Sequence, residues 1–519
     1  MTLKLYNTLT KKTETFTPLQ PNKISLYTCG PTVYDRLHVG NWTAYIFWDT
    51  LVRTLIADGF HVERVMNITD VGHLVSDEDE GEDKLEKGAR REGKTAWDIA
   101  EMYSEDFIAG MEKLGLITPE HIVRATDFIP QQLELVRVLK EKGYTYQTSD
   151  GIYFDTAKFP TYAAFAGLDL AAQKAGARVE FNPEKRSPSD FALWKFTKPG
   201  ETRDMEWETP ADLLEGSAST LSSGDLTPLE RQRTTREAEE TGASKNLDSK
   251  KPIMGFPGWH LECSAMAMSI LGPTIDIHTG GIDHIPVHHT NEIAQSEAAS
   301  GQQFAHFWLH NNHLKVDGTK ISKSLGNGFT LQDLKDKGFN PLDFRMFVLQ
   351  GQYQNEGNFT FENLQAAKNR LHHWRNIAAL RHQTHDTLQD DDEKSSNDGT
   401  VSLLAVSGVI LEALNDNVNT PAALRAIDEA FSQLDGKSLD DIHQYGLAQL
   451  LEHIDGLLGL QLIPSTPDID DESKQLIISR ERARDEKNWV SSDAIRDNLK
   501  ARGIIVRDTA GGTIWEYAS

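Results

Sequence analysis

The chain has 519 residues, of which 39% are hydrophobic and 25% are charged, and its formal net charge is −25. These proportions are typical of a globular protein, and the length predicts three or four domains. The acidic balance argues against a general nucleic-acid coat protein, because such proteins are basic overall.

Only two cysteines occur in the whole chain. So few cysteines point to a reducing cytoplasm rather than to a disulfide framework. The opening MTLKLYNTLTKKT lacks the apolar core of a signal peptide, and no stretch reaches the length of a membrane span. We therefore expect a cytoplasmic protein with no membrane partner.

The first part of the chain alternates strand and helix patterns. ISLYTC, residues 24–29, predicts a buried strand, and a helix follows from about Gly40 to Gly59. Glycine is well suited to the position after a helix C-terminus. HVERVMNI then predicts the next strand. This order predicts a βαβ unit within a parallel sheet.

Residues 119–252 are predicted to form an inserted domain. The helical pattern QQLELVRVLKEKG and the strand GIYFD lie in its first part. Its last part, at about 208–251, is rich in Ser, Thr and charge, so we expect a mobile insertion there with one short helix starting at Thr227–Pro228.

Two further strand patterns, IDIHTGG and FWLHNNHLKVDG, follow the insertion. The chain then reads as helical from Phe359 to about Leu460, interrupted by a polar linker at Asp390–Gly399. The tail from Lys474 to Ser519 has nine Lys/Arg and seven Asp/Glu. We predict that this tail is a mildly basic α+β domain.

The two cysteines and two later residues carry the ligand types of a metal site. Cys29 ends the first strand pattern, Cys263 lies in GWHLECSAM, and His288 and Glu292 follow in HHTNE. Residues four apart share one helix face, and two thiolates, an imidazole and a carboxylate form a closed zinc shell. The alternative is that both cysteines are small buried hydrophobes. His289 competes with His288 because spacing does not separate adjacent histidines.

HVGN, residues 38–41, opens the helix that follows the first strand. The free N–H groups of a helix N-terminus bind phosphate, and Gly40 allows a nucleotide to approach closely. His38 can also donate a hydrogen bond to phosphate. A plain turn is the alternative reading.

Two later motifs also carry nucleotide chemistry. In KISKS, Lys320 and Lys323 are three residues apart and can stabilise the charge on a transferring phosphoryl group or a leaving pyrophosphate. In HTGGID, Gly280 and Gly281 permit backbone contact with a ligand, and Asp283 can bind ribose hydroxyls. The alternatives are a solvated basic loop and a tight turn.

In combination, these motifs resemble those of class I aminoacyl-tRNA synthetases. HVGN and KISKS are similar to the HIGH and KMSKS signatures, and YTCGPTVYD, GWHLECSAM and HHTNEIAQS resemble cysteine–tRNA ligases in particular. The likeness continues through DFALWK, NDNVNTPAAL and the tail RERARDEKNWVSSDAIRDNLKARGI. It therefore covers nearly the whole chain.

The resemblance implies an enzyme that activates L-cysteine with Mg²⁺-ATP and transfers it to the 3′ end of cysteine tRNA, with zinc selecting the thiol. It implies zinc ligands at Cys29, Cys263, His288 and Glu292. The catalytic and ATP-binding residues implied are His38, Gly40, Asn41, Gly280, Gly281, Asp283, Lys320 and Lys323. Thr69 and Trp259 are implied for the cysteine pocket.

The expected fold is α/β, with a Rossmann-like parallel-sheet catalytic domain, an inserted domain, a helical bundle and a small α+β C-terminal domain. The expected boundaries are 1–118 and 253–315 for the two catalytic halves, 119–252 for the inserted connective domain, 316–389 for the KISKS loop and stem-contact region, 400–463 for the helical tRNA-binding bundle and 473–519 for the anticodon-binding domain. The resemblance also implies a monomer.

Two features depart from the family pattern. Asn41 replaces the second histidine of HIGH, although an amide still donates to phosphate, and the Ser/Thr-rich insertion is longer than usual.

The sequence leaves two rival functions open. A ligase joining cysteine to an amino sugar would not need the helical region or the basic tail. A zinc-stabilised RNA-binding protein would not need Lys323.

Overall fold

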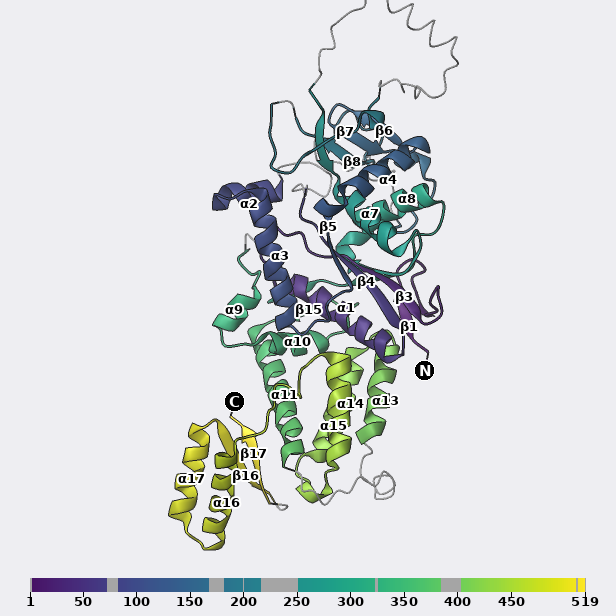
Figure 1. Cartoon of the computed structure of the whole chain (residues 1–519). Coiled ribbons are helices and arrows are strands. Elements are labelled where there is room, and N and C mark those ends of the chain that lie inside the picture. Colours follow the sequence, from purple (N-terminus) through teal and green to yellow (C-terminus); the bar gives the residue numbers. More distant parts are fainter. Residues whose placement is uncertain are drawn as a thin grey trace, which may run out of the picture.

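The structure is a computed structural model of the whole chain (Figure 1). It describes residues 2–71, 83–167, 182–198, 200–215, 251–322, 325–383, 403–509 and 512–518. Three features of the sequence prediction lie outside the described residues: the short helix at Thr227–Pro228, the linker at Asp390–Gly399, and Lys323.

A five-stranded parallel sheet forms the centre of the catalytic domain, in the order β12-β11-β3-β4-β5. Its strands are β3 (Lys23–Thr28), β4 (His61–Ile68), β5 (His121–Arg124), β11 (Ile275–Gly281) and β12 (Ala305–Asn311). The strand order reverses between β3 and β11, which makes this pair the topological switch point, where ligands bind in open parallel sheets. The predicted α/β fold is confirmed.

Helix α1 (Val39–Ala57) connects β3 to β4. A capping box starts it: the backbone N–H of Asn41 donates to His38 Nδ1 at 3.3 Å, and the backbone N–H of His38 donates to Asn41 Oδ1 at 3.1 Å. Gly59 follows the helix with a φ of +88°, as predicted for a residue that ends a helix. Most of α1 is buried because it lies between the sheet and the helical region (Figure 1).

The inserted domain is built on an antiparallel sheet in the order β6-β7-β8-β10-β9, with α4 (Ile129–Glu141) beside it. The strands are β6 (Thr145–Thr148), β7 (Gly151–Phe154), β8 (Phe191–Phe196), β9 (Trp207–Glu208) and β10 (Met254–Pro257). After β10 the chain passes through Gly258 into α7 (Trp259–Leu271). The inserted sheet thus leads the chain back to the central sheet, where α8 (Thr290–Ser300) packs against α7.

The helical region and the C-terminal domain lie below the central sheet in Figure 1. Their helices are α9 (Leu331–Asp336), α10 (Pro341–Leu349), α11 (Phe361–Ala379), α13 (Leu403–Asn415), α14 (Thr420–Leu434), α15 (Gln444–Leu458), α16 (Asp471–Asp485) and α17 (Trp489–Ala501). The last two pack with the hairpin of β16 (Ile504–Thr509) and β17 (Gly512–Tyr517), which confirms the α+β tail. Among the described residues, no helix has the length and apolarity needed to cross a membrane.

The remaining elements lie outside the two five-stranded sheets. They are the hairpin of β1 (Lys4–Asn7) and β2 (Lys12–Thr15), the helices α2 (Lys84–Glu92) and α3 (Ala96–Lys113), and a three-stranded sheet of β13 (Leu314–Val316), β14 (Thr319–Lys320) and β15 (Gly357–Phe359). Strand β14 ends in the first lysine of KISKS. This small sheet therefore fixes where the KISKS loop begins.

Candidate metal and nucleotide site

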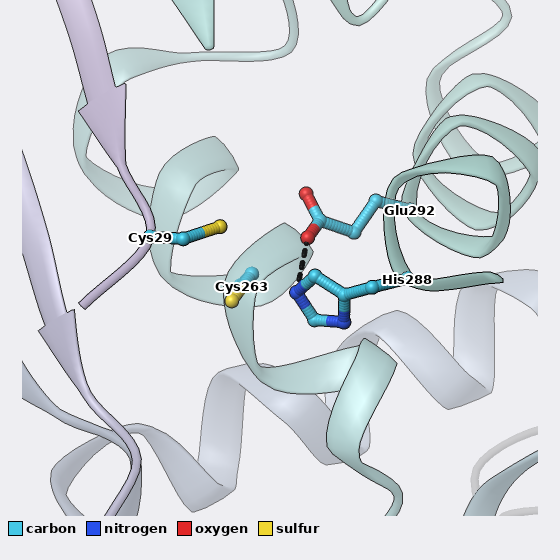
Figure 2. Close-up of side chains that lie close together, drawn as sticks. All are labelled: Cys29, Cys263, His288 and Glu292. Carbon is cyan, nitrogen blue, oxygen red and sulfur yellow. Dashed lines mark ion pairs between the residues drawn. The ribbon is translucent and has the colours of Figure 1, made fainter. Parts of the chain in front are cut away.

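Cys29, Cys263, His288 and Glu292 converge at the switch point of the sheet (Figure 2). Cys29 directly follows β3, Cys263 lies in the second turn of α7, and Glu292 lies in the first turn of α8. His288 belongs to the π-helical turn that precedes α8. One ligand atom from each residue lies within 4.8 Å of the other three. The sequence-predicted set is therefore brought together as a group that could hold a metal ion.

Local packing fixes the approach of these elements. The backbone N–H of Cys29 donates to the Thr279 carbonyl oxygen at 3.1 Å, which holds Cys29 beside the end of β11. On the other side, a Cβ on Gly258 would overlap the backbone carbonyl of Ala192 in β8. Only glycine lets α7 begin this close to the inserted sheet, so Gly258 sets the position of Cys263.

Glu292 is fully buried between two histidines. Its Oε1 lies 2.6 Å from His288 Nε2, and its Oε2 lies 2.6 Å from His278 Nε2. Burial alone would raise the pKa of Glu292, but the charges of His278 and His288 hold it below its ordinary value. Burial alone would likewise lower the pKa of His288, and Glu292 raises it to about 10 instead.

The surroundings shift the pKa values of the two thiols in opposite directions. Burial would raise the pKa of Cys29, but the hydrogen bond from Cys263 and the charge of His289 outweigh burial and lower it. The same hydrogen bond, together with burial, raises the pKa of Cys263. Two sulfurs, an imidazole and a carboxylate match zinc ligation. A bound divalent cation would displace protons from these groups, and its charge would balance the negative charge of the thiolates and the carboxylate. The donor set fits a zinc ion.

A second group of four overlaps the first. Cys29, His278, His289 and Glu292 also place one ligand atom each within 4.8 Å of one another. His289 Nε2 lies 3.4 Å from Cys29 Sγ. Both adjacent histidines therefore face the same centre, and the alternative between His288 and His289 has a structural basis.

The two residues implied for the cysteine pocket differ in how they relate to the four-residue cluster. The Trp259 ring stacks on His288, with centroids 4.3 Å apart and planes 21° apart. Thr69 follows β4, and its hydroxyl donates to Glu262 Oε2 at 3.0 Å and accepts from Asn67 Nδ2 at 3.1 Å. Trp259 thus contacts a candidate ligand directly, whereas Thr69 reaches α7 through Glu262, the residue before Cys263.

The structure places the HVGN and KISKS segments side by side. The backbone N–H of Val39 donates to the Phe329 carbonyl oxygen at 2.8 Å, and a Cβ on Gly40 would lie 2.8 Å from Ile321 Cδ1 of KISKS. Lys320 is exposed at the end of β14. The predicted phosphate-binding elements therefore meet at the N-terminal end of α1, whose first turn contains no acidic residue.

The HTGGID segment lies beside the four-residue cluster. A Cβ on Gly280 would lie 2.6 Å from His289 Cε1 and 2.9 Å from His284 Nδ1, so these two histidines leave room only for glycine there. Gly281 faces open space. The Asp283 side chain is 65% exposed and forms an ion pair with His313 Nε2 at 3.1 Å. Asp283 therefore lies on the solvent side of the site.

Two family profiles match the chain. The profile described as "tRNA synthetases class I (C) catalytic domain" matches residues 15–213 and 240–369, and the one described as "Cysteinyl-tRNA ligase anticodon binding domain" matches residues 466–515. The cysteine–tRNA ligase of Treponema denticola is 37% identical, over 99% of this chain and 100% of its own length. Cysteine–tRNA ligase 1 of Burkholderia lata is 39% identical, over 99% of this chain and 96% of its own length. The chain belongs to the cysteine–tRNA ligase family.

Membership of this family identifies the chain as a class I aminoacyl-tRNA synthetase. Solved structures of other synthetases have the same fold. Methionyl-tRNA synthetase of Mycobacterium tuberculosis, bound by methionyl-adenylate, aligns with a TM-score of 0.54 and 13% identity, over 84% of this chain and 92% of its own. A LeuRS of Agrobacterium radiobacter K84, in a ternary complex with tRNA, aligns with a TM-score of 0.55 and 14% identity. The alignment covers 88% of this chain and 87% of that LeuRS chain.

Several histidines that no sequence motif singles out as ligands surround the cluster. His260 Nδ1 lies 3.0 Å from His288 Nδ1, and His310 Nε2 lies 2.7 Å from His289 Nδ1. Such partners orient ligand imidazoles. One signal was available: eight of the 18 histidines fall between His260 and His313. That local density marks a site more clearly than any single motif in the segment.

Proposed function

We propose that this family member attaches L-cysteine to cysteine tRNA in two steps. The carboxylate of cysteine attacks the α-phosphate of Mg²⁺-ATP, and cysteinyl-adenylate and pyrophosphate form. The terminal ribose hydroxyl of the tRNA then attacks the activated carbonyl, and AMP leaves. The observation that carries the proposal is the convergence of Cys29, Cys263, His288 and Glu292 at the switch point, at the end of the strand that precedes α1.

The proposed zinc ligands are Cys29, Cys263, His288 and Glu292. A bound zinc ion would select the substrate thiol over the hydroxyl of serine, because soft sulfur ligands are preferred and the thiol loses its proton easily. Trp259 and Thr69 would hold the rest of the amino acid beside the metal. Such recognition supplies a selectivity that a hydrophobic pocket does not reach without editing.

The phosphates of ATP are proposed to bind at the N-terminal end of α1. His38 and the backbone at Gly40 contact phosphate oxygens, with the helix dipole oriented in their favour. Asn41 already accepts from the backbone through Oδ1, so its Nδ2 group is the part that serves phosphate. Lys320 and Lys323 stabilise the leaving pyrophosphate. Gly280, Gly281 and Asp283 contact the adenosine.

The chain is proposed to act as a cytoplasmic monomer. Its helical bundle at 400–463 and C-terminal domain at 473–519 would bind the tRNA, with the C-terminal domain reading the anticodon.

The deciding experiment is ATP–pyrophosphate exchange by the zinc-loaded protein. We expect exchange that requires L-cysteine, followed by charging of cysteine tRNA. Lys323→Ala should lower the exchange rate by about 100-fold or more, because it removes charge stabilisation in the transition state. Binding of cysteine alone should persist in this variant. Absence of cysteine-dependent exchange in the zinc-loaded parent protein would contradict the proposal.

A further inference from the structure

A buried cluster of charges joins α1 to the helical region. Asp49 of α1 and Arg345 of α10 are both fully buried and form an ion pair. Arg53, one turn along α1, is 11% exposed and donates from Nε to Asp49 Oδ2 at 2.7 Å. Asp49 Oδ1 also accepts the backbone N–H of Ile117 at 2.6 Å. Two guanidinium groups therefore share one carboxylate in the interior.

The remaining donors of both arginines reach the C-terminal ends of two helices. Arg345 Nε donates to the Leu458 carbonyl oxygen at 2.6 Å, and Arg345 Nη1 donates to Leu114 at 3.0 Å. Arg53 Nη2 donates to Gly115 at 2.7 Å, and its Nη1 donates to Gly456 at 2.9 Å. Leu458 is the last residue of α15, and Leu114 is the C-cap residue that follows α3.

These contacts explain how a net positive charge is accommodated in the interior. Carbonyls in the last turn of a helix lack intrahelical donors, and they carry the negative end of the helix dipole. Asp49 carries one negative charge beside two positive guanidinium groups. The carbonyl groups at the ends of α3 and α15 supply further negative potential. The charges of Arg345 and Arg53 in turn outweigh burial and lower the pKa of Asp49.

The approach of α15 depends on one glycine. Gly459 follows α15 with a φ of +62°. A Cβ there would lie 2.6 Å from Arg345 Nη2 and 2.9 Å from Arg53 Cζ. The helix end is therefore shaped around both guanidinium groups, and a larger residue would push α15 away from α1.

The cluster lies on the same helix as the proposed phosphate-binding end. Asp49 is ten residues from Val39, so about 15 Å of α-helix separates the cluster from His38 and Asn41. In Figure 1, α1 runs from the catalytic sheet across the tops of the helices below it. A shift of α15 against Asp49 would turn the helical region relative to α1, while α1 keeps its contacts with β4 and β11 of the sheet.

We propose that Asp49, Arg53 and Arg345 are positioning residues for tRNA charging. They hold α1 at a fixed position on α10 and α15, so that a tRNA bound to the helical region presents its 3′ end to a correctly placed active site. The proposal rests on the proposed function. It concerns the transfer step, because activation of cysteine is the first of the two proposed steps and involves no tRNA.

Arg345→Lys tests this role, since lysine keeps the charge but contacts fewer acceptors. We expect tRNA-free pyrophosphate exchange and the Kd for tRNA to stay within about twofold of the parent. Single-turnover transfer from cysteinyl-adenylate to tRNA should fall by about tenfold or more, because small misplacements of reacting groups are costly. A general loss of folding would lower exchange and transfer equally.

Arg124→Lys is the matched control, because Arg124 pairs with Glu101 at 2.5 Å within the catalytic half and does not touch the cluster. This control should not separate exchange from transfer. If Arg345→Lys does not fold, Arg53→Lys takes its place, and the same separation is expected. Equal effects on exchange and transfer in the folded variant would overturn the positioning role while leaving the ligase intact. Absence of exchange in the parent would overturn both proposals.

Discussion

At the scale of single residues, adjacent histidines provide two ways to complete one metal shell. His288 and His289 differ in what supports them. His288 lies against Glu292 and under the Trp259 ring, whereas His289 lies beside Cys29 and in contact with His310. Burial lowers the pKa of His289 to about 3, so its imidazole stays neutral. Either residue is chemically able to bind zinc.

We expect His288→Gln to lower the zinc affinity more than His289→Gln. Loss of a direct ligand should cost about 100-fold or more, as Cys263→Ser should, whereas loss of an orienting neighbour costs about 10- to 100-fold. Competition with a chromophoric chelator measures both affinities. Cysteine affinity should fall in parallel with zinc binding. The reverse order of the two histidine variants would assign the ligand role to His289.

Asn41 illustrates a residue with two roles. It stands at the position of the second histidine of the HIGH signature, where we propose that it binds phosphate. In the structure its side chain is also half of the capping box that starts α1. An amide suits both tasks because it accepts through oxygen and donates through nitrogen.

At the scale of elements, the turn between α13 and α14 is fastened by one asparagine. Asn417 has a φ of +59°. Its Oδ1 accepts from the Tyr6 backbone N–H at 2.8 Å and from the Tyr353 hydroxyl at 2.7 Å. Its Nδ2 donates to Gln354 Oε1 at 2.6 Å. This side chain therefore ties the helical region to the N-terminal hairpin.

We expect Asn417→Ala to lower the free energy of unfolding by about 4 kcal/mol. The loss combines about 1 kcal/mol for each side-chain hydrogen bond with the strain of a left-handed backbone at a residue with a Cβ. Asn417→Gly should lose about 1 kcal/mol less, because glycine adopts this φ without strain. Urea unfolding measures both variants. Equal losses would show that the backbone conformation contributes nothing.

The C-terminal domain contains a pH-sensitive ion pair between α16 and β16. Asp508 accepts from both Nη atoms of Arg480 at 2.7 Å and pairs with Arg484 at 2.8 Å. The Arg480 hydrogen bonds lower the pKa of Asp508 from 3.8 to about 2. Because the carboxyl pKa is lower in the folded state, the ionised group stabilises the fold at pH values above the pKa of the unfolded state. This stability is lost as the pH falls through the pKa of the folded state.

Asp508→Asn should therefore be less stable than the parent at about pH 5, and this difference should shrink as the pH falls from 3.8 toward about 2. Urea unfolding at several pH values measures it. Asp497→Asn is the control, because Asp497 is 74% exposed and its ion pair, with Arg496 at 3.8 Å, includes neither Arg480 nor Arg484. A pH-independent difference would assign the effect of Asp508 to packing rather than to charge.

At the scale of the whole molecule, the proposed metal site connects two distant parts of the chain. Cys29 belongs to the first half of the catalytic domain, while the other three proposed ligands come after the inserted domain. A zinc ion bound there would hold β3 against α7 and α8. Because it binds the folded state, the metal should stabilise the catalytic domain by about 2.7 kcal/mol at a free concentration of 100 Kd.

Removing zinc with a chelator should thus lower the temperature at which the catalytic domain unfolds. Differential scanning calorimetry measures the shift, and it should reverse when zinc is restored. In Cys263→Ser the chelator should have little effect, because the site is already weakened. A shift of the same size in that variant would show that the stabilising metal binds elsewhere.

Much of the architecture was predictable because its signals are local. The strand–helix–strand order, the glycine after α1 and the helical region depend on hydrophobic spacing and turn residues. The HVGN and KISKS segments were identified from their own residues, and they lie in contact in the fold. Residue types made Cys29, Cys263 and Glu292 candidate metal donors, and the resemblance to cysteine–tRNA ligases favoured them over buried cysteines.

Other features depend on approach between distant segments. No spacing rule brings Arg345 to Asp49, or Leu458 to Leu114, since each pair is separated by hundreds of residues. The histidines around the cluster likewise gain their roles from the strand order, which places β11 next to β3. The sequence by itself determined which chemical groups this protein carries and which helices and strands it forms. Tertiary structure alone decided which groups meet, because burial and the switch in strand order set distances that local sequence does not encode.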